Sequence, residues 1–554
     1  MKKIIIYTAA ALLVSGLSGC KDWLDINTDP NNATTALMTE ALLLPAQQYD
    51  MLNNHVNSTN AWMLSHHLTK SGEVSGNYTF LNGQVMPQDL DSWWSTYYSI
   101  NWNLKFIHDL AVENEDPAYQ AISEVLQVIN FQRMVDIWGN IPYTEAINPE
   151  EYNMPKYDKA EDIYTDLIAR AHAAAQMLES AQGNYNNLTE LESVDIMCHG
   201  DLAQWTRLAY TIEFRLLMRV SAVRDVSAQL TDIYQKCLSI EENVEANPGY
   251  LPETDKMQIL YEAYGWDKNG GRNNNHRYYM PTKDLVDMLR THNDPRLRVY
   301  ADPRRELGDD KDGNANYSRF DLDNEYYVGI PYGQANPAGE EYTTTTGTGL
   351  LAGSSDKNNG RLRSSTFIAG SEIGFLLAEA ALQGYIPGGE AAAKDYYERA
   401  VISAFNRHEA AMQDPTENFT NYVGGPMTGM KDPITGSAED AARAYLDQND
   451  EFCNWDLMSS KEEKLYAICA QRWLAFVGYN PLEAWIEHRR TDMPDLESSN
   501  QSPQTKNYCR LPYPQTERNL NAANVMAEPE INVFESTVFW DVDNPTVLRA
   551  ELYL

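Results

Sequence analysis

Apolar residues recur at spacings of three and four along much of the chain, a pattern that predicts amphipathic helices. One such stretch covers residues 160–178. Asp158 precedes it and Glu161 follows three residues later, which indicates an N-cap with a capping-box partner. Another stretch, residues 465–476, ends before Pro481, which we expect to stop the helix. One further stripe, 205–216, has the same spacing.

The pattern over residues 371–407 predicts a helical hairpin. Gly384 suits the C-cap of the first helix, and the Pro-Gly-Gly segment 387–389 suits the turn. Small residues at such positions are typical of tetratricopeptide-like units, in which they let neighbouring helices approach closely. We therefore expect a mostly α fold with degenerate helix-pair repeats, and a non-repeating helical fold is the alternative. Two more pairs can be drawn: 119–138 with 158–178, and 201–224 with the segment after it.

Two regions interrupt the helical pattern, residues 70–90 and 263–370. The second is far longer than an ordinary loop, and its many aromatic residues argue against disorder. We expect a large irregular loop region that forms a functional surface on the helices. Tyr and Trp rings can stack on sugars, while Arg and Asn side chains can hydrogen-bond to them. The predicted ligand-binding residues, with packing as the alternative role for each ring, are Tyr78, Tyr264, Trp266, Arg272, Asn274 and Tyr327.

The N-terminus has the pattern of a bacterial lipoprotein signal. Two lysines precede an apolar segment, residues 4–14, that is too short to span a bilayer as a finished helix. Small residues then lead to Cys20. We expect residues 1–19 to be a removed signal peptide, residues 20–554 to form a single ligand-binding domain, and Cys20 to carry the lipid. An ordinary secretory signal with a chance cysteine is the alternative.

The formal net charge of −36 argues against nucleic acid as a partner, because the surface repels phosphate backbones. It also argues against attachment to an anionic membrane through a basic patch, so attachment has to come from the lipid. Tyr outnumbers Phe by 34 to 13, and such amphipathic rings suit a glycan-binding surface. The cysteines include no CxxC, so neither a redox pair nor a zinc site is predicted, and Cys469 is expected to be a buried thiol.

Signatures of enzymes and cofactor sites are absent or broken. The chain has no GxSxG elbow and no Walker loop. His408 begins a zincin-like string, but Met412 replaces the second histidine, and we expect a surface helix end there. The segment from Asp310 to Asp321 is partly an EF-hand loop with a misplaced glycine, so we expect a polar turn and no metal. Carboxylates are too numerous for any one pair to indicate a glycosidase. We predict a non-catalytic protein without a cofactor.

Several short sequence segments, which we call strings, are spread over the whole chain, and structural roles can be given to them. Asp136 to Tyr143 fits a helix that ends at Gly139 and is followed by an extended turn. Arg215 and Arg219 lie one helical turn apart and are expected to pair with carboxylates. The strings, in order, are 24–31 (LDINTDPN), 136–146 (DIWGNIPYTEA), 205–219, 293–296 (NDPR), 371–380, 471–473 (QRW), 483–490 and 510–514 (RLPYP).

In this order, the strings resemble those of the SusD/RagB family of Bacteroidetes outer-membrane lipoproteins, from Cys20 to the C-terminus. The resemblance implies a SusD-like helical fold with four degenerate tetratricopeptide-like helix pairs and a looped ligand-binding face. It implies a lipid-anchored location on the extracellular face of the outer membrane. It also implies a partner, a SusC-like TonB-dependent transporter on which the protein acts as a lid.

The sequence-based hypothesis is a surface lipoprotein that binds oligosaccharide and delivers it to that transporter. A peptide-binding lid of the same kind of importer is the first alternative. A glycoside hydrolase and a purely structural surface protein are the others. Because family members share these strings while their ligand loops differ, the resemblance leaves the ligand open.

Overall fold

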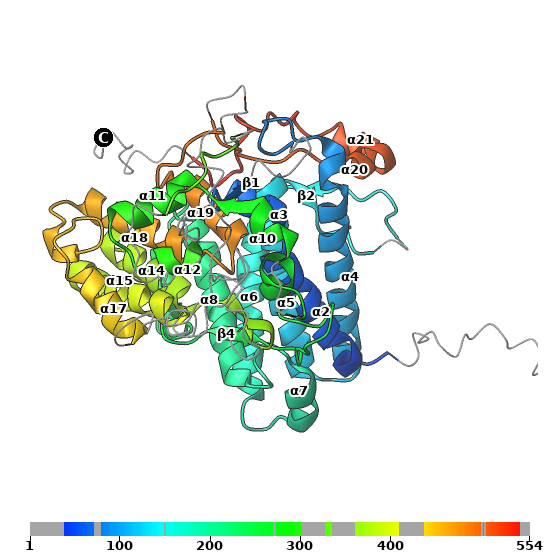
Figure 1. The fold of residues 1–554 in the computed structure, drawn as a ribbon. Helices are drawn as coiled ribbons and strands as arrows, with labels where there is room; N and C mark the ends of the chain where they lie inside the picture. The colour runs from blue at the N-terminus through cyan, green and yellow to red at the C-terminus, as the bar shows by residue number, and fades with distance from the viewer. Residues whose placement is uncertain are drawn as a thin grey trace, which may run out of the picture.

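The structure is a computed structural model that describes residues 38–70, 79–148, 151–269, 273–301, 327–334, 360–408, 437–499, 502 and 506–542. These residues form a mainly helical fold, as predicted (Figure 1). Their named strands make three short antiparallel pairs. The pairs are β1 (Leu68–Lys70) with β5 (Tyr279–Pro281), β2 (Ile141–Pro142) with β3 (Tyr157–Asp158), and β4 (Val244–Ala246) with β6 (Ser365–Ile368).

The N-terminal helices form one layered array. α2 packs on α4, α4 on α5, α5 on α6 and α6 on α8, and the long rods lie side by side in Figure 1. Where they pack, these helices bury many apolar side chains, which provides the main stabilisation. The bounds are α2 (Glu40–Val56), α3 (Thr59–Leu64), α4 (Asp91–Glu113), α5 (Pro117–Trp138), α6 (Ala160–Ala181), α7 (Leu188–Val194), α8 (Leu202–Val220) and α9 (Ser227–Ile233).

The C-terminal helices cover the other side of α8, with α14 and α15 as the most extensively packed pair. The 3-10 turn η2 (Pro87–Leu90) lies directly before α4, whereas the π-turn η3 (Tyr261–Gly265) and the 3-10 turn η8 (Trp455–Leu457) lie in the later part of the chain. The helices are α10 (Asn274–Tyr278), α11 (Lys283–Thr291), α12 (Leu297–Tyr300), α14 (Gly370–Gln383), α15 (Gly389–Asn406), α17 (Ala438–Leu446), α18 (Lys461–Ala475), α19 (Pro481–Thr491), α20 (Gln515–Leu520) and α21 (Ala522–Val525).

The predicted hairpin is present as α14 and α15. Gly384 caps α14 with a left-handed φ of 84°, a conformation that glycine adopts without strain. Gly374 lies where the helices touch, since a Cβ built on it would stand 2.8 Å from the Cβ of Ala400. The small residues therefore set the close approach of the two helices, as the pattern predicted.

Two predicted helix ends are wrong. The N-cap of α6 is Lys159, and its side chain makes no capping hydrogen bond. The Asp158 carboxylate instead accepts hydrogen bonds from the backbone N–H of Tyr143 and Thr144, at 3.0 and 2.8 Å. The turn after β2 thus competes successfully for the carboxylate that the sequence pattern assigned to the helix.

Pro481 begins a helix rather than stopping one. α18 already ends at Ala475, and Pro481 is the first residue of α19, capped by the Asn480 side chain. A proline fits this position because the first helical N–H has no partner within the helix.

The region 263–370, predicted to be one irregular surface, is more regular where the structure describes it. It contains α10, β5, α11 and α12, and it ends in β6. β5 pairs with β1 and β6 with β4, so both segments are tied to distant parts of the chain.

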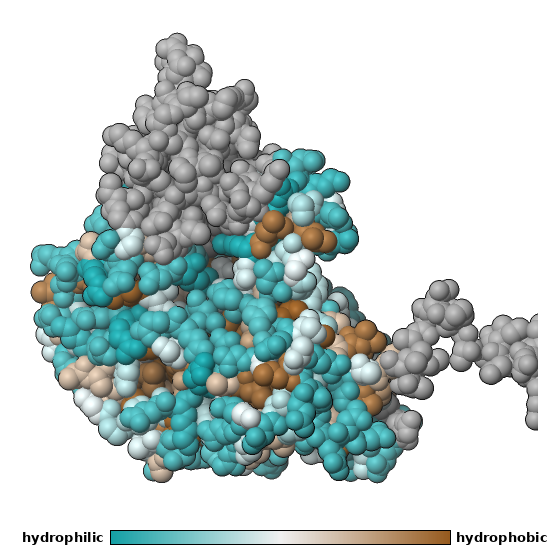
Figure 2. Space-filling model, turned by 90° about the horizontal axis from the view of Figure 1, so that it is seen from below, coloured by the Kyte–Doolittle hydropathy of each residue, from teal (hydrophilic) through white to brown (hydrophobic). Residues whose placement is uncertain are grey.

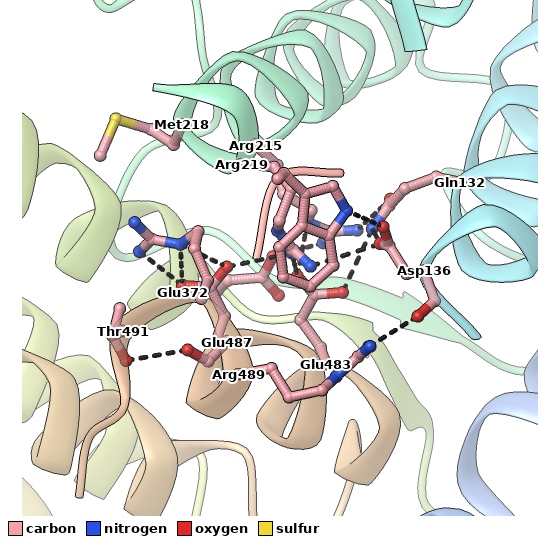
Figure 3. A network of polar contacts seen from close by, with 12 residues as sticks. Gln132, Asp136, Arg215, Met218, Arg219, Glu372, Glu483, Glu487, Arg489 and Thr491 are labelled. Carbon is pink, nitrogen blue, oxygen red and sulfur yellow. Dashed lines mark hydrogen bonds and ion pairs between the residues drawn. The ribbon is translucent and has the colours of Figure 1, made fainter. Parts of the chain in front are cut away.

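A buried network of charged side chains joins α5, α8, α14, α18 and α19 (Figure 3). The guanidinium of Arg215 donates to Glu372 at 2.6 Å. Arg219 pairs with Asp136 at 3.3 Å, with Glu487 at 3.0 Å and also with Glu483. The prediction that both arginines pair with carboxylates is confirmed. Charges buried in this way are tolerated only when they are paired.

Candidate functional site

Of the residues predicted to bind ligand, three rings are buried. The exposed fractions of Tyr264, Trp266 and Tyr327 are 3%, 2% and 0%. Asn274 is exposed in α10, whereas Tyr78 and Arg272 lie outside the described residues. The structure therefore brings Tyr264, Trp266 and Asn274 into one neighbourhood, but the rings do not present a free face to solvent.

The contacts of Tyr264 and Trp266 show what the rings do in this structure. The Tyr264 hydroxyl is hydrogen-bonded to the Thr59 hydroxyl at 3.3 Å, and burial raises the pKa of the Tyr264 phenol. The Trp266 ring packs against Tyr261, with ring centroids 5.5 Å apart, and against His276, at 5.7 Å. These rings support the segment around η3, and their direct contact with a ligand stays a prediction.

A polar groove lies elsewhere, between α2 and the first half of α4. Its volume is about 620 Å³, within the range typical of small-ligand sites. Trp93 and Ile100 are its buried lining residues, with exposed fractions of 7% and 2%, and the remaining lining residues are polar. We call it the α2–α4 groove, and its lining residues are Asp50, Asn53, Asn54, Asn57, Ser58, Ser92, Trp93, Ser95, Thr96, Ser99 and Ile100.

The groove forms because both helices carry a polar stripe where they face each other. Positions three, four and seven residues apart share one face of a helix. On α2 and its C-cap, residues 50, 53, 54 and 57 are Asp or Asn, and on α4, residues 92, 95, 96 and 99 are Ser or Thr. Short polar side chains leave space that leucines would have filled, so the two helices enclose a groove lined with amide and hydroxyl groups.

Some of these polar groups bond to one another, and others remain available. Asn57 donates to Asn53 at 3.2 Å, and the Thr96 hydroxyl donates to the Ser92 carbonyl at 2.8 Å. The Asp50 carboxylate, at the rim, has no hydrogen bond or ion pair with another described residue. Partial burial raises the pKa of Asp50. The groove can therefore both donate and accept hydrogen bonds.

Trp93 links the groove to the core. Its ring packs edge-on against Trp138, with centroids 6.3 Å apart, and beside Tyr97 at the same distance. Trp93, Trp94 and Tyr97 are core residues, with exposed fractions of 7%, 6% and 1%. Yet the Nε1–H of Trp93 has no hydrogen-bond partner within the described part of the protein. An indole N–H is a donor only, and this one is buried rather than exposed to the groove.

The sequence-based prediction did not include this groove, because it used aromatic residues in irregular regions as the signal for a binding site. The usable signal was the run of Ser and Thr at helical spacing in residues 92–99, on a helix whose other side is apolar. A polar stripe of this kind is ordinarily a solvated face, and only the packing of α2 against it turns the stripe into a groove.

A second cleft of about 530 Å³ lies between the end of α6, α7 and the start of α8. Glu192, His199 and Asp201 are its ionisable lining residues besides Tyr185. No lining side chain that the structure describes is a buried polar group without a partner. The α2–α4 groove is therefore the stronger candidate for a ligand-binding site.

Several other sequence predictions can be compared with the structure. His408 is buried rather than on a surface helix end: α15 ends at Asn406, and the His408 ring is hydrogen-bonded to the Tyr300 hydroxyl at 3.2 Å. Cys469 is a buried free thiol, as expected. Among the residues with described positions, no three His, Cys, Asp or Glu side chains are grouped to hold a metal ion. The segment from Asp310 to Asp321 lies outside the described residues.

No helix within the described ranges is both long and apolar enough to cross a bilayer.

Comparisons with known proteins agree with this architecture. A SusD-like family model, described as "Starch-binding associating with outer membrane", matches residues 30–514. A SusD homologue from Bacteroides fragilis has 18% sequence identity and a TM-score of 0.70, over 91% of this chain and 99% of its own. A chitin-binding SusD homologue from Flavobacterium johnsoniae has 20% identity and a TM-score of 0.66, over 91% and 99%.

A third SusD homologue, from Bacteroides uniformis, has 20% identity and a TM-score of 0.64, over 90% of this chain and 99% of its own. At these identities the solved structures establish a shared fold. No curated protein matches the chain.

Proposed function

Because the chain belongs to the SusD-like family of starch-binding proteins associated with the outer membrane, we propose that it is a non-catalytic receptor for oligosaccharides. Its binding site is the α2–α4 groove. Cys20 carries a lipid that holds the protein on the extracellular face of the outer membrane. The bound oligosaccharide is then delivered to a SusC-like TonB-dependent transporter.

The observation that supports this proposal best is the chemistry of the groove. A saccharide presents hydroxyl groups that both donate and accept hydrogen bonds, together with apolar C–H faces. The groove offers amide and hydroxyl groups on its walls and a carboxylate acceptor in Asp50. Ligand hydroxyls can satisfy each of these groups without any change in protonation.

The peptide-binding alternative fits the groove less well. Peptides gain specificity by placing side chains in apolar pockets or against charges. Trp93 and Ile100 are the apolar lining residues, and both are almost completely buried, so they offer little surface to an apolar side chain.

The glycoside-hydrolase alternative also lacks a favourable arrangement in the groove. Glycoside hydrolysis ordinarily uses two carboxyl groups on opposite sides of the scissile bond. Asp50 is the single carboxylate among the lining residues. The groove therefore supports binding and release of an unchanged saccharide.

The first experiment measures binding of purified protein to a panel of oligosaccharides and peptides by calorimetry, with malto- and chito-oligosaccharides included. We expect saccharides to bind. Retention of peptides alone would overturn the oligosaccharide proposal, and release of shortened products would overturn the non-catalytic one.

Asn53→Ala tests the groove itself. Asn53 lines the groove on α2, and removal of its side-chain amide should cost about 1 kcal/mol of binding, or roughly a fivefold rise in Kd. Asn519→Ala is the matched control, because Asn519 is exposed on α20 and does not line the groove. Equal effects of the two substitutions would contradict a binding role for Asn53.

Delivery to a transporter is tested by isolating the protein from the membranes of its native host with a mild detergent. We expect a TonB-dependent transporter to copurify with it. Repeated isolation without such a partner would argue against the delivery step while leaving saccharide binding intact.

A further inference from the structure

We infer that the α2–α4 groove selects uncharged saccharides and rejects those that carry carboxylate or sulfate groups. This inference rests on the proposed function and specifies its class of ligand. It follows from the charge of the groove and its surroundings rather than from the shape of any one sugar.

Among the described residues, the lining of the groove contains no cation. Asp50 is the single described lining side chain with a formal charge, and the others are Asn, Ser, Thr, Trp and Ile. Binding of an anionic sugar requires the loss of its hydration, which is costly unless a cation or several donors replace the water. The described lining has donors but no Lys, Arg or His to offset that loss.

The rim of the groove adds to its negative potential. The Asp50 carboxylate lines the groove and has no hydrogen bond or ion pair with another described residue. An anion that approached this rim would thus meet an uncompensated negative charge. Like charges at a binding surface disfavour the wrong partner and slow its association.

The guanidinium of Arg133, a cation near the groove, contacts residues of the core instead. Arg133 is 2% exposed, and its guanidinium contacts the ring nitrogen Nδ1 of His55 on α2. The same guanidinium lies over the Phe367 ring, 5.7 Å from its centroid. Arg133 therefore points into the core and cannot reach a sugar in the groove without unpacking α2.

The test starts from whichever neutral oligosaccharide of the panel binds. Its primary hydroxyls are oxidised to carboxylates, and a second sample of the oxidised sugar is converted to the methyl ester. The three ligands share one backbone and differ mainly in charge. We expect the carboxylate form to bind at least tenfold more weakly than the parent, and the uncharged ester to recover most of that loss.

Asp50→Asn removes the negative charge from the rim while keeping a side chain of the same size. We expect the affinity ratio between the neutral sugar and its carboxylate form to fall by threefold or more. Asp232→Asn is the control, because Asp232 is 67% exposed, lies on α9 and does not line the groove. That variant should leave the ratio as it is in the parent protein.

The outcomes separate the two proposals. If the carboxylate form binds as tightly as its parent, or if only anionic sugars in the panel bind, the charge selectivity is overturned while saccharide binding stands. If no saccharide binds, the proposed function itself fails and the selectivity fails with it. An unchanged ratio in Asp50→Asn would overturn the role of the rim carboxylate.

Discussion

Single residues in the charged core depend on one another across several helices. Arg489 donates to the backbone carbonyl of Asp136 at 2.7 Å, and the Trp540 indole donates to the Asp136 carboxylate at 2.9 Å (Figure 3). Asp136 thereby joins α5 to residues more than 300 positions away in sequence. Removing one member would leave a buried charge without its partner, which costs more than the pair contributes.

Glu372 provides a prediction at this scale. Burial raises its pKa to about 7, although the nearby Arg215 opposes the shift. Because an unfolded glutamate titrates near pH 4.3, the folded protein holds this proton more tightly. Its contribution to stability is present at low pH and falls as the pH rises from about 4.5 to about 7.

Glu372→Gln cannot titrate, so it should lose that pH dependence. Relative to the parent, its free energy of unfolding should rise by on the order of 1–3 kcal/mol between about pH 4.5 and pH 7.5. Urea unfolding at a series of pH values measures the difference. A difference that stays flat or falls over this window would show that Glu372 is ionised throughout.

At the scale of elements, helices in this protein meet in two contrasting ways. α14 and α15 approach closely through small residues, so that Gly374 lies against Ala400 and Ile240. α2 and α4 carry short polar residues where they face each other, and they leave a groove. One contact contributes stability through dense packing, and the other provides a surface for a ligand.

Gly374→Ala tests the close contact. Alanine is the better helix former, but its Cβ would stand 2.8 Å from the Cβ of Ala400 and 3.0 Å from Ile240 Cγ2. We expect a loss of about 1–3 kcal/mol in the free energy of unfolding, because the two helices have to separate. Chemical denaturation measures the change.

The double variant Gly374→Ala with Ala400→Gly serves as the control for this contact. Removing the Ala400 methyl makes room for the new one, so the two substitutions together should cost less than their sum. If the double variant loses as much stability as the two single variants summed, or if Gly374→Ala is as stable as the parent, then the Cβ atoms do not limit how closely the helices approach.

At the scale of the whole molecule, the surface is hydrophilic and strongly acidic. Figure 2 shows mostly hydrophilic residues on the face seen from below, with hydrophobic residues in separate small patches. Together with the net charge of −36, this surface offers no basis for binding an anionic membrane directly. A covalent lipid is then the natural means of attachment.

Cys20→Ala tests the anchor. Without an acylated cysteine, we expect the protein to move from the membrane fraction to the soluble fraction, as measured by cell fractionation and detergent phase partition. Cys509→Ala is the control, since that partly exposed cysteine plays no part in the anchor. Retention of the Cys20→Ala protein in the membrane would contradict lipid attachment at this residue.

The sequence alone determined the features that depend on neighbours within a turn or two. Helical periodicity and the caps at Gly139 and Gly384 were predicted correctly. Arg215 and Arg219 were also correctly expected to pair with carboxylates, but their partners lie on other helices and could not be named from the sequence. The order of the strings along the chain led to the family. These signals are local or linear, so they can be read without knowing which helices touch.

Only the tertiary structure decided where the groove lies and which rings are buried. Residues 50–58 and 92–100 form the groove because α2 packs against α4, and no local pattern reports that contact. Tyr264 and Trp266 are covered by neighbours such as Thr59 and His276, and aromatic composition alone did not reveal that burial; their contact with a ligand stays a prediction. Burial and pairing depend on segments distant in sequence, and their positions are set by the packing of the whole fold.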